Sequence, residues 1–237
     1  MSEAGTARAP APVITIDGPS GAGKGTVAKQ VAGRLGWLWL DSGALYRVVG
    51  LLGARRGLAP GDEAGHAALA AGLHIVFMGA ADGSDAVLVD GEDLAPELRS
   101  EAVGRLASAV AVLPAVRAAL VGRQQSFRRL PGLVADGRDM GSAIFPDAPL
   151  KVYLTASVAE RAERRYKQLK DKGLGGSLAD LSRDIEERDR RDAGRAASPL
   201  LQTADAVRID SSARSVESVV DEVLALASAR GLGARPR

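Results

Sequence analysis

A glycine-rich segment near the N-terminus constrains the fold of this 237-residue chain more than any other part of its sequence. The apolar run Val13–Asp17 precedes the segment, and helical spacing of apolar residues follows it over Lys24–Leu35, with Gly36 at the expected C-cap. The order strand, glycine loop and helix predicts an α/β fold with a phosphate-binding loop. The loop reads Gly18-Pro19-Ser20-Gly21-Ala22-Gly23-Lys24-Gly25-Thr26.

This loop has the chemistry to hold the phosphates of ATP. Its glycines permit tight turns, so several backbone N–H groups can converge on phosphate oxygens, and the N-terminus of the following helix adds positive potential. Lys24 is placed to neutralise the outer phosphates, while Thr26 or Ser20 could contact magnesium or phosphate oxygens. All residues from Gly18 to Thr26 are therefore candidate ATP ligands, and the alternative is a glycine turn without function.

The rest of the chain alternates between short apolar runs and helical patterns. Strands separated by helices predict a parallel sheet with helices on both of its faces. The expected strands are Trp37–Asp41, Leu133–Asp136, Leu150–Thr155 and Val207–Asp210, and the expected helices start at Ala44 and span Ala156–Lys170 and Val216–Ala229.

Two regions interrupt this alternation. Leu73–Met78 and Ala86–Val89 flank a Gly/Asp turn and predict a small antiparallel insert. Residues 160–195 are dense in nearly balanced charge, which is typical of a solvated helical pair or of a mobile lid over an active site. A glycine break falls inside that region, at Gly173, Gly175 and Gly176. Residues 1–11 and 231–237 are expected to be disordered tails.

Composition excludes several kinds of protein. The chain has no cysteine, so disulfides, thiolate nucleophiles and Cys-ligated zinc are ruled out, and two histidines disfavour a His-based catalytic site. A net charge of +2 and few aromatic residues argue against nucleic-acid binding. The N-terminus does not resemble a secretory signal, and no apolar run approaches the ~20 residues of a membrane span. We therefore expect a cytoplasmic protein without a membrane partner, and a monomer.

Polar residues follow the ends of two predicted strands, where ligands of a doubly wound sheet bind. After the second strand, Ser42 is a predicted helix N-cap and Arg47 could clamp a phosphate, although a capped helix with a surface arginine has the same pattern. After the third strand, Asp136 could hold a magnesium-bound water or only begin a turn. Arg138 and Asp139 beside it are difficult to explain by packing.

A third polar segment lies in the charged region. Arg188, Arg191, Asp192 and Arg195 are spaced i, i+3, i+4 and i+7, which places them on one helical face. Such a face is typical of a salt-bridged surface helix. Beside a phosphate-binding loop it is also a candidate arginine face for a transferred phosphate, since phosphoryl transfer depends on charge stabilisation.

Together these segments resemble the bacterial cytidylate kinases, a family of P-loop nucleoside monophosphate kinases. Gly25 separates Lys24 from Thr26, as in the monophosphate-kinase variant of the loop. The resemblance runs from about Pro12 to near residue 228. The segments that carry it are Ile14 to Thr26, Leu40 to Arg47, Ala135 to Gly141, Phe145 to Pro149 and Glu187 to Arg195.

The resemblance implies one kinase domain over residues 12–230. Its core would comprise 12–63, 101–159 and 196–230, with a monophosphate-binding insert at about 64–100 and a helical lid at about 160–195. The implied reaction is direct in-line transfer of a phosphoryl group from ATP to CMP or dCMP, with Mg²⁺, giving CDP or dCDP.

The resemblance also implies residue roles. Asp139 would accept a hydrogen bond from the cytosine amino group, and Ser108 and Arg117 match the other base-recognising positions. The acceptor phosphate would contact Ser42, Arg47 and Arg138, and Arg195 would contact a phosphate. The pentose would contact Arg188 and Asp192, and Tyr46 would line the same site. The expected catalytic residues are Lys24, Arg138, Arg188 and Arg195.

Two other interpretations remain open at this point. One is a small P-loop kinase that acts on a different nucleotide or on a metabolite hydroxyl, which would not need Asp139 and Arg117 near a base. The other is a non-catalytic protein, either a nucleotide-binding regulator or a nucleic-acid-binding protein, that uses the loop to sense nucleotides. A panel of phosphate acceptors separates the three.

Overall fold

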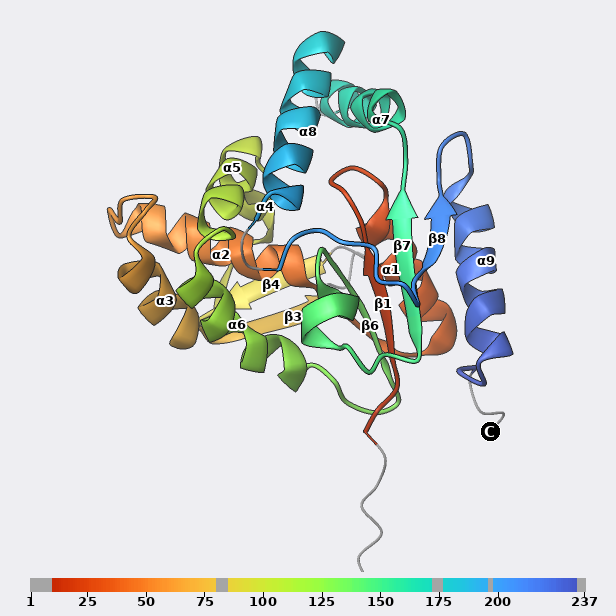
Figure 1. The fold of residues 1–237 in the computed structure, drawn as a ribbon. Coiled ribbons are helices and arrows are strands. Elements are labelled where there is room, and N and C mark those ends of the chain that lie inside the picture. The colour runs from red at the N-terminus through yellow and green to blue at the C-terminus, as the bar shows by residue number, and fades with distance from the viewer. Residues whose placement is uncertain (1–9, 80–84, 172–176, 196–197, 234–237) are drawn as a thin grey trace, which may run out of the picture.

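The computed structural model describes residues 10–79, 85–171, 177–195 and 198–233. Figure 1 shows the helices and strands, with one or more helices between successive strands of the central sheet. The elements are β1 (Val13–Asp17), α1 (Lys24–Leu35), β2 (Leu38–Asp41), α2 (Ser42–Arg55), α3 (Glu63–Ala71), β3 (Ile75–Gly79), β4 (Asp85–Val89), β5 (Glu92–Asp93), α4 (Ala95–Leu98), α5 (Glu101–Val110), α6 (Pro114–Ser126), β6 (Leu133–Gly137), η1 (Met140–Ile144), β7 (Leu150–Thr155), α7 (Val158–Asp171), α8 (Leu178–Ala193), β8 (Val207–Asp210) and α9 (Val216–Ala229).

A five-stranded parallel sheet in the order β2-β6-β1-β7-β8 forms the centre of the fold. This confirms the predicted α/β class and puts β1, which leads into the glycine loop, in the middle of the sheet. The bounds of β1, β7 and β8 are those predicted from the sequence. β2 begins one residue later than expected, at Leu38, and β6 extends to Gly137.

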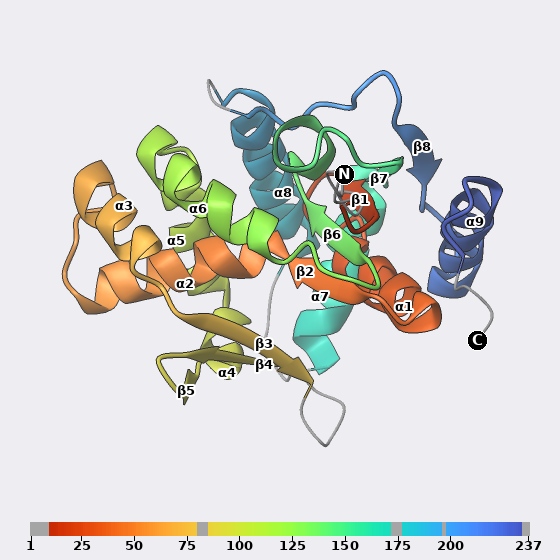
Figure 2. The ribbon, with the colours of Figure 1, turned by 90° about the horizontal axis from the view of Figure 1, so that it is seen from below.

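The side chains of β1 alternate between two cores, one on each face of the sheet. Ile14 and Ile16 are buried with α1 and α9 on one face. Val13 is buried on the other face with α2, α3 and α6. Figures 1 and 2 show these two helical layers on opposite sides of the strands. Burying each of these large aliphatic side chains stabilises the fold by about 1.5–3 kcal/mol.

The predicted antiparallel insert is confirmed. β3 pairs with β4, Ile75 opposite Val89, and the short β5 adds a third strand that sequence patterning did not indicate. The turn between β3 and β4 lies mostly outside the described residues. Figure 2 shows this small sheet beside α2. The helices α5 and α6, which were not anticipated either, pack against α2 and α3.

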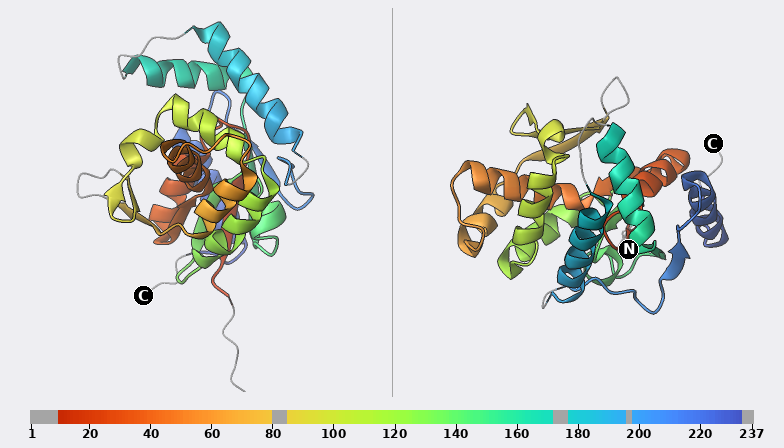
Figure 3. Two further views of the ribbon diagram at one scale, coloured as in Figure 1. Left: turned by 90° about the vertical axis from the view of Figure 1, so that its left-hand side faces the viewer. Right: turned by 90° about the horizontal axis from the view of Figure 1, so that it is seen from above.

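The charged region forms the helices α7 and α8, which lie above the carboxyl ends of the strands (Figures 1 and 3). The glycine break predicted between them, Gly173 to Gly176, lies outside the described residues. One prediction is wrong: α8 ends at Ala193 and Gly194 is its C-cap, so Arg195 lies beyond the helical face assigned to it.

Each predicted tail includes a residue that is packed against the rest of the protein. Residues 1–9 and 234–237 lie outside them, but Ala11 is buried and its carbonyl accepts a hydrogen bond from Arg128 at 2.7 Å. Leu232 is also buried, next to the end of α9.

Among the described residues no single helix has both the length and the apolar character needed to cross a membrane, and only the bent pair α5 and α6 passes that test jointly.

Candidate active site

Three glycines with positive φ shape the loop between β1 and α1. At Gly18, where φ is 149°, a Cβ would lie 1.9 Å from the Leu154 carbonyl oxygen, so another residue would collide with β7. Gly21 and Gly23 have φ values of 80° and 90°, and Gly23 is the N-cap of α1. The loop thus leads into a helix whose first N–H groups are free to bind an anion.

Lys24 and Asp136 lie beside this loop in a desolvated setting. Lys24 begins α1, and its Nζ donates to the Pro19 carbonyl at 2.8 Å. Burial, followed by the charge of Arg138, lowers the pKa of Lys24 to about 7. Burial and then Asp41 raise the pKa of Asp136 to about 7. An anionic ligand would stabilise the charged form of Lys24.

Asp136 is oriented toward the start of α1. Its Oδ2 accepts a hydrogen bond from Trp39 Nε1 at 2.9 Å, and a Cβ at Gly25 would lie 3.9 Å from the same oxygen. Thr26 is exposed in the wall of the same cleft. Among the described residues no three Asp, Glu or His side chains gather to hold a metal. The site therefore fits Mg²⁺ if water and phosphate oxygens supply most of its ligands.

On the opposite side of the cleft, Asp192 of α8 joins two arginines. It is 1% exposed and accepts a hydrogen bond from Arg138 Nε at 2.7 Å, as well as an ion pair from Arg195. Burial alone would raise the pKa of Asp192, but Arg138 and Arg195 outweigh it and hold the pKa below its usual range. This carboxylate fixes both guanidinium groups before any ligand arrives.

Arg188 and Arg47 add positive charge to this side. Burial and then the charge of Arg138 lower the pKa of Arg188 to about 10, and within the described part of the chain its buried Nε has no hydrogen-bond partner. Arg47 donates to the Leu98 carbonyl at 2.7 Å, and burial lowers its pKa. A phosphate group would relieve the mutual repulsion of these cations.

A second buried ion pair joins Asp139 to Arg117 of α6, and both side chains are under 10% exposed. Arg117 also donates to the Ala111 carbonyl at 3.1 Å and lies 5.6 Å from the centre of the Tyr46 ring. The Tyr46 hydroxyl is buried without a hydrogen-bond partner among the described residues, and burial raises the pKa of Tyr46 to about 12. Ser108 is buried on α5 in the wall of the same cleft.

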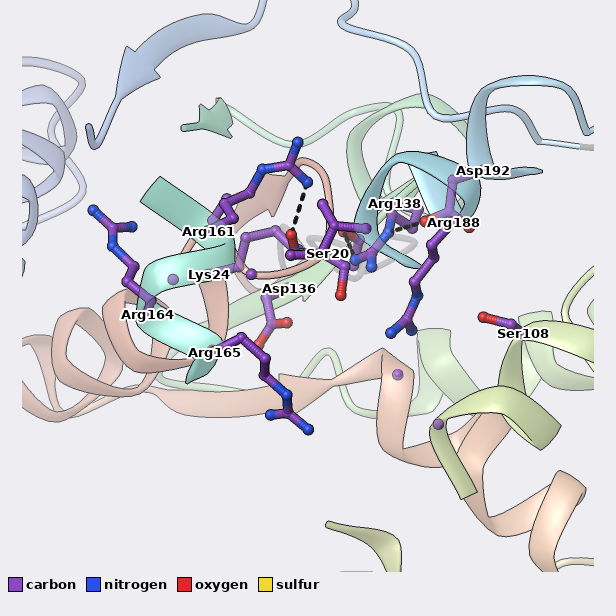
Figure 4. A pocket seen from close by; sticks show the side chains of 18 of the residues that line it. Ser20, Lys24, Ser108, Asp136, Arg138, Arg161, Arg164, Arg165, Arg188 and Asp192 are labelled. Carbon is purple, nitrogen blue, oxygen red and sulfur yellow. Dashed lines mark hydrogen bonds and ion pairs between the residues drawn. The ribbon is translucent and has the colours of Figure 1, made fainter. Parts of the chain in front are cut away.

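All these groups border one cleft of about 890 Å³. Figure 4 shows Lys24 and Asp136 on one side of the cleft, Arg138 turned toward Asp192, and Arg188 extending into the open space that Ser108 also borders. The structure thus brings together the predicted residues Ser20 to Thr26, Ser42, Tyr46, Arg47, Ser108, Arg117, Arg138, Asp139, Arg188, Asp192 and Arg195.

At three predicted site positions, the structure gives the residue a different place or role from the predicted one. Gly18 and Pro19 shape the loop without lining the cleft. Ser42 is not the N-cap of α2, because Asp41 holds that position and accepts from the Ala44 N–H at 3.2 Å. Ser42 is instead the first residue of α2, buried in the cleft wall.

Three arginines of α7 that line the cleft were not predicted from the sequence (Figure 4). Arg161 donates to the Ser20 carbonyl at 3.0 Å and forms two hydrogen bonds with Asp189 of α8. Arg164 donates to the backbone and hydroxyl of Ser211. Arg165 pairs with Glu101 of α5. Their spacing i, i+3 and i+4 on one helical face was the available signal.

Comparison with known proteins shows the family of this chain. A family model described as cytidylate kinase matches residues 14–229. The chain is 55% identical over 215 residues to a cytidylate kinase from Methylococcus capsulatus, covering 91% of this chain and 96% of that protein. It is 52% identical over 224 residues to one from Stutzerimonas stutzeri, with 94% and 98% covered.

Among solved structures, a gluconokinase from Sinorhizobium meliloti is similar with a TM-score of 0.45 and 18% identity, over 94% of each chain. The family follows from the family model and the two relatives. The chain belongs to the cytidylate kinase family and is a nucleotide-binding kinase.

Proposed function

We propose that this kinase uses ATP and Mg²⁺ to phosphorylate CMP and dCMP, giving CDP and dCDP. The observation that carries the proposal is the ion pair of Asp139 with Arg117, which lies in the same cleft as the phosphate-binding loop and the arginines around Asp192. One side of the cleft suits a triphosphate, and the other suits a base together with a single phosphate.

Base selection follows from the chemistry of Asp139. An ionised carboxylate is only an acceptor, so it binds the amino group of cytosine and repels the carbonyl oxygen that uracil carries at the same ring position. Arg117 pairs with this carboxylate and orients it from α6. Ser108 supplies a hydroxyl from α5 in the same part of the cleft. Together these residues favour cytosine over uracil.

Phosphoryl transfer would be direct and in line, with no covalent enzyme intermediate. The acceptor phosphate oxygen is already anionic, so no strong base is required. Lys24 and the loop amides hold the donor phosphates, while Arg47 and Arg138 orient the acceptor. Arg188 and Arg195 stabilise the charge of the transition state. Mg²⁺, held near Thr26 and Asp136, would shield the charge of the ATP phosphates.

Water must be kept from the donor phosphate during this reaction. We propose that residues of about 160–195 act as the lid and that about 64–100 form the monophosphate-binding insert. Arg161 supports a lid role, because it joins the donor loop to Asp189 of α8. Closure of such a segment excludes water and completes the set of arginines.

An acceptor panel tests the proposal. ADP release is measured with ATP, Mg²⁺ and, in turn, CMP, dCMP, UMP, AMP, GMP and small metabolite alcohols. We expect kcat/KM to be highest for CMP and dCMP. A higher value for another nucleotide or for an alcohol would replace the proposed substrate. Tight ATP binding without transfer to any acceptor would instead indicate a nucleotide sensor.

A further inference from the structure

Asp17, the last residue of β1, is buried at the centre of the molecule without a part in the proposed chemistry. It is 6% exposed, and both of its carboxylate oxygens are used. Oδ1 accepts from the Met140 N–H at 2.8 Å, and Oδ2 accepts from the Gly141 N–H at 2.8 Å. These two amides begin η1, the turn that directly follows Asp139.

Asp139 stands at the N-cap of η1, where an aspartate ordinarily caps its own helix. Here its side chain makes no capping hydrogen bond to the described backbone of η1 and pairs with Arg117 instead. Asp17 supplies the missing cap from the neighbouring strand. One carboxylate thus binds the η1 amides, and the other is left to face the cleft.

The fit between β1 and η1 is tight. A Cβ at Gly141 would lie 2.8 Å from Thr15 Oγ1 and 3.3 Å from Asp17 Oδ2, so a glycine is required for η1 to approach the strand. Thr15 and Asp17 point to this face of the sheet, because side chains alternate along β1. The parallel register sets Asp17 beside Gly137, two residues before Asp139.

We propose that Asp17 is a positioning residue for base specificity: by capping η1 it keeps the Asp139 carboxylate turned toward the acceptor base. This inference rests on the proposed function, since it assigns Asp139 to the base. Asp17 touches neither substrate in this account and acts through the loop that carries Arg138 and Asp139.

Stability alone does not explain a carboxylate at this position. Burial raises the pKa of Asp17 to about 6, although the Gly141 and Met140 amides act in the opposite direction. Because this pKa lies above the ordinary value of 3.8, the charge of Asp17 costs the fold stability as pH rises from about 4 to 6, and that cost persists at pH 7.

The charged and titratable groups around Asp17 come from three elements. Asp139 raises the pKa of Asp17 and Lys24 of α1 lowers it. From β7, the stem of Lys151 lies at Gly141, and Tyr153 is within electrostatic range. The Lys151 ammonium is itself paired with Asp205 at 2.8 Å.

The first test is Asp17→Asn, which keeps the shape of the side chain but replaces one acceptor oxygen by an NH₂ donor. One of the two backbone N–H groups of η1 then loses its acceptor. We expect the KM for CMP to rise about tenfold and the preference for CMP over UMP to fall by a similar factor. The KM for ATP and the melting temperature at pH 7 should change little. Asp210→Asn is the matched control, since Asp210 also ends a strand of the sheet and accepts a backbone N–H from Ser212.

Equal changes in both KM values, or none, would overturn the proposal. If Asp17→Asn does not fold, Gly141→Ala perturbs the same contact while keeping the carboxylate, and it should give the same selective loss of CMP affinity. An unselective effect of Gly141→Ala would contradict the positioning role.

A measurement without substrate separates this inference from the proposed function. In the apoprotein, the ¹⁵N–¹H signals of Met140 and Gly141 should titrate with a midpoint near pH 6 and should not titrate in Asp17→Asn. If these signals respond to pH in the same way in the natural protein and in Asp17→Asn, the capping role fails even if CMP is the substrate. If they titrate as expected but CMP is not phosphorylated, the proposed function fails and only the cap remains.

Discussion

The proposed donor side and the proposed acceptor side of the cleft both suit phosphate, but the chain builds them differently. Most of the proposed donor side is one continuous segment, Gly18 to Thr26, which offers backbone N–H groups and the ammonium of Lys24. Asp136 and Arg161 are added to it from β6 and α7. The acceptor side is assembled from single residues of α2, α5, α6, α8 and the loop after β6. Asp139 and Asp192 hold Arg117 and Arg138, and the Leu98 carbonyl holds Arg47.

This difference predicts different sensitivities. A backbone cradle depends on glycine conformations and on one cation, so its failure should affect every acceptor equally. The acceptor side depends on individual side chains, so its changes should be selective for the acceptor nucleotide. Substitutions on each side can therefore test whether the two halves of the cleft act separately.

The largest effect is expected from Lys24→Ala on the donor side. Loss of the buried ammonium removes charge stabilisation from the transferred phosphoryl group, and kcat should fall roughly 10²- to 10³-fold with every acceptor. Steady-state ADP release measures the change. Lys29→Ala is the control, because Lys29 is an exposed lysine of the same helix. Near-normal turnover of Lys24→Ala would remove the donor-site assignment.

The next effect is expected from Asp139→Asn on the acceptor side. A charge-assisted hydrogen bond contributes about 1.5–3 kcal/mol, so the KM for CMP should rise about 10- to 150-fold. The KM for ATP should remain within twofold. Asp147→Asn, which removes the acid of an exposed pair with Arg128, serves as the control. A similar rise in both KM values would mean that Asp139 is structural.

The smallest effect is expected from Arg161→Lys, which tests the contact between α7 and the donor loop. A lysine cannot reproduce the planar fork that reaches the Ser20 carbonyl and both oxygens of Asp189. The loss of about 1 kcal/mol should raise the KM for ATP roughly fivefold and leave the KM for CMP unchanged. Arg34→Lys, at a surface site that also pairs with two acids, is the control. A selective effect on CMP would show that the two sides are coupled through α7.

Much of the donor side was readable from the sequence because its structure is local. The bounds of β1, α1 and the loop glycines follow from apolar spacing and from the backbone angles that glycine permits. Several acceptor residues were proposed from strand ends and helical spacing, and their individual roles came from the resemblance. No local rule indicated the pairs Asp139–Arg117 and Asp192–Arg138. The N-cap assigned to Ser42 failed for a related reason, since two adjacent residues, Asp41 and Ser42, can both cap a helix.

The sequence by itself determined the α/β fold, the glycine loop and the residue types available for phosphate and base. Only the tertiary structure decided how those residues are held. Asp17 caps a turn 123 residues away, and Arg161 reaches the Ser20 carbonyl 141 residues away. Such contacts produce no periodic pattern in the sequence. The number of residues between the two partners depends on how the parallel strands and their connections are arranged, and not on the repeat of a helix or strand.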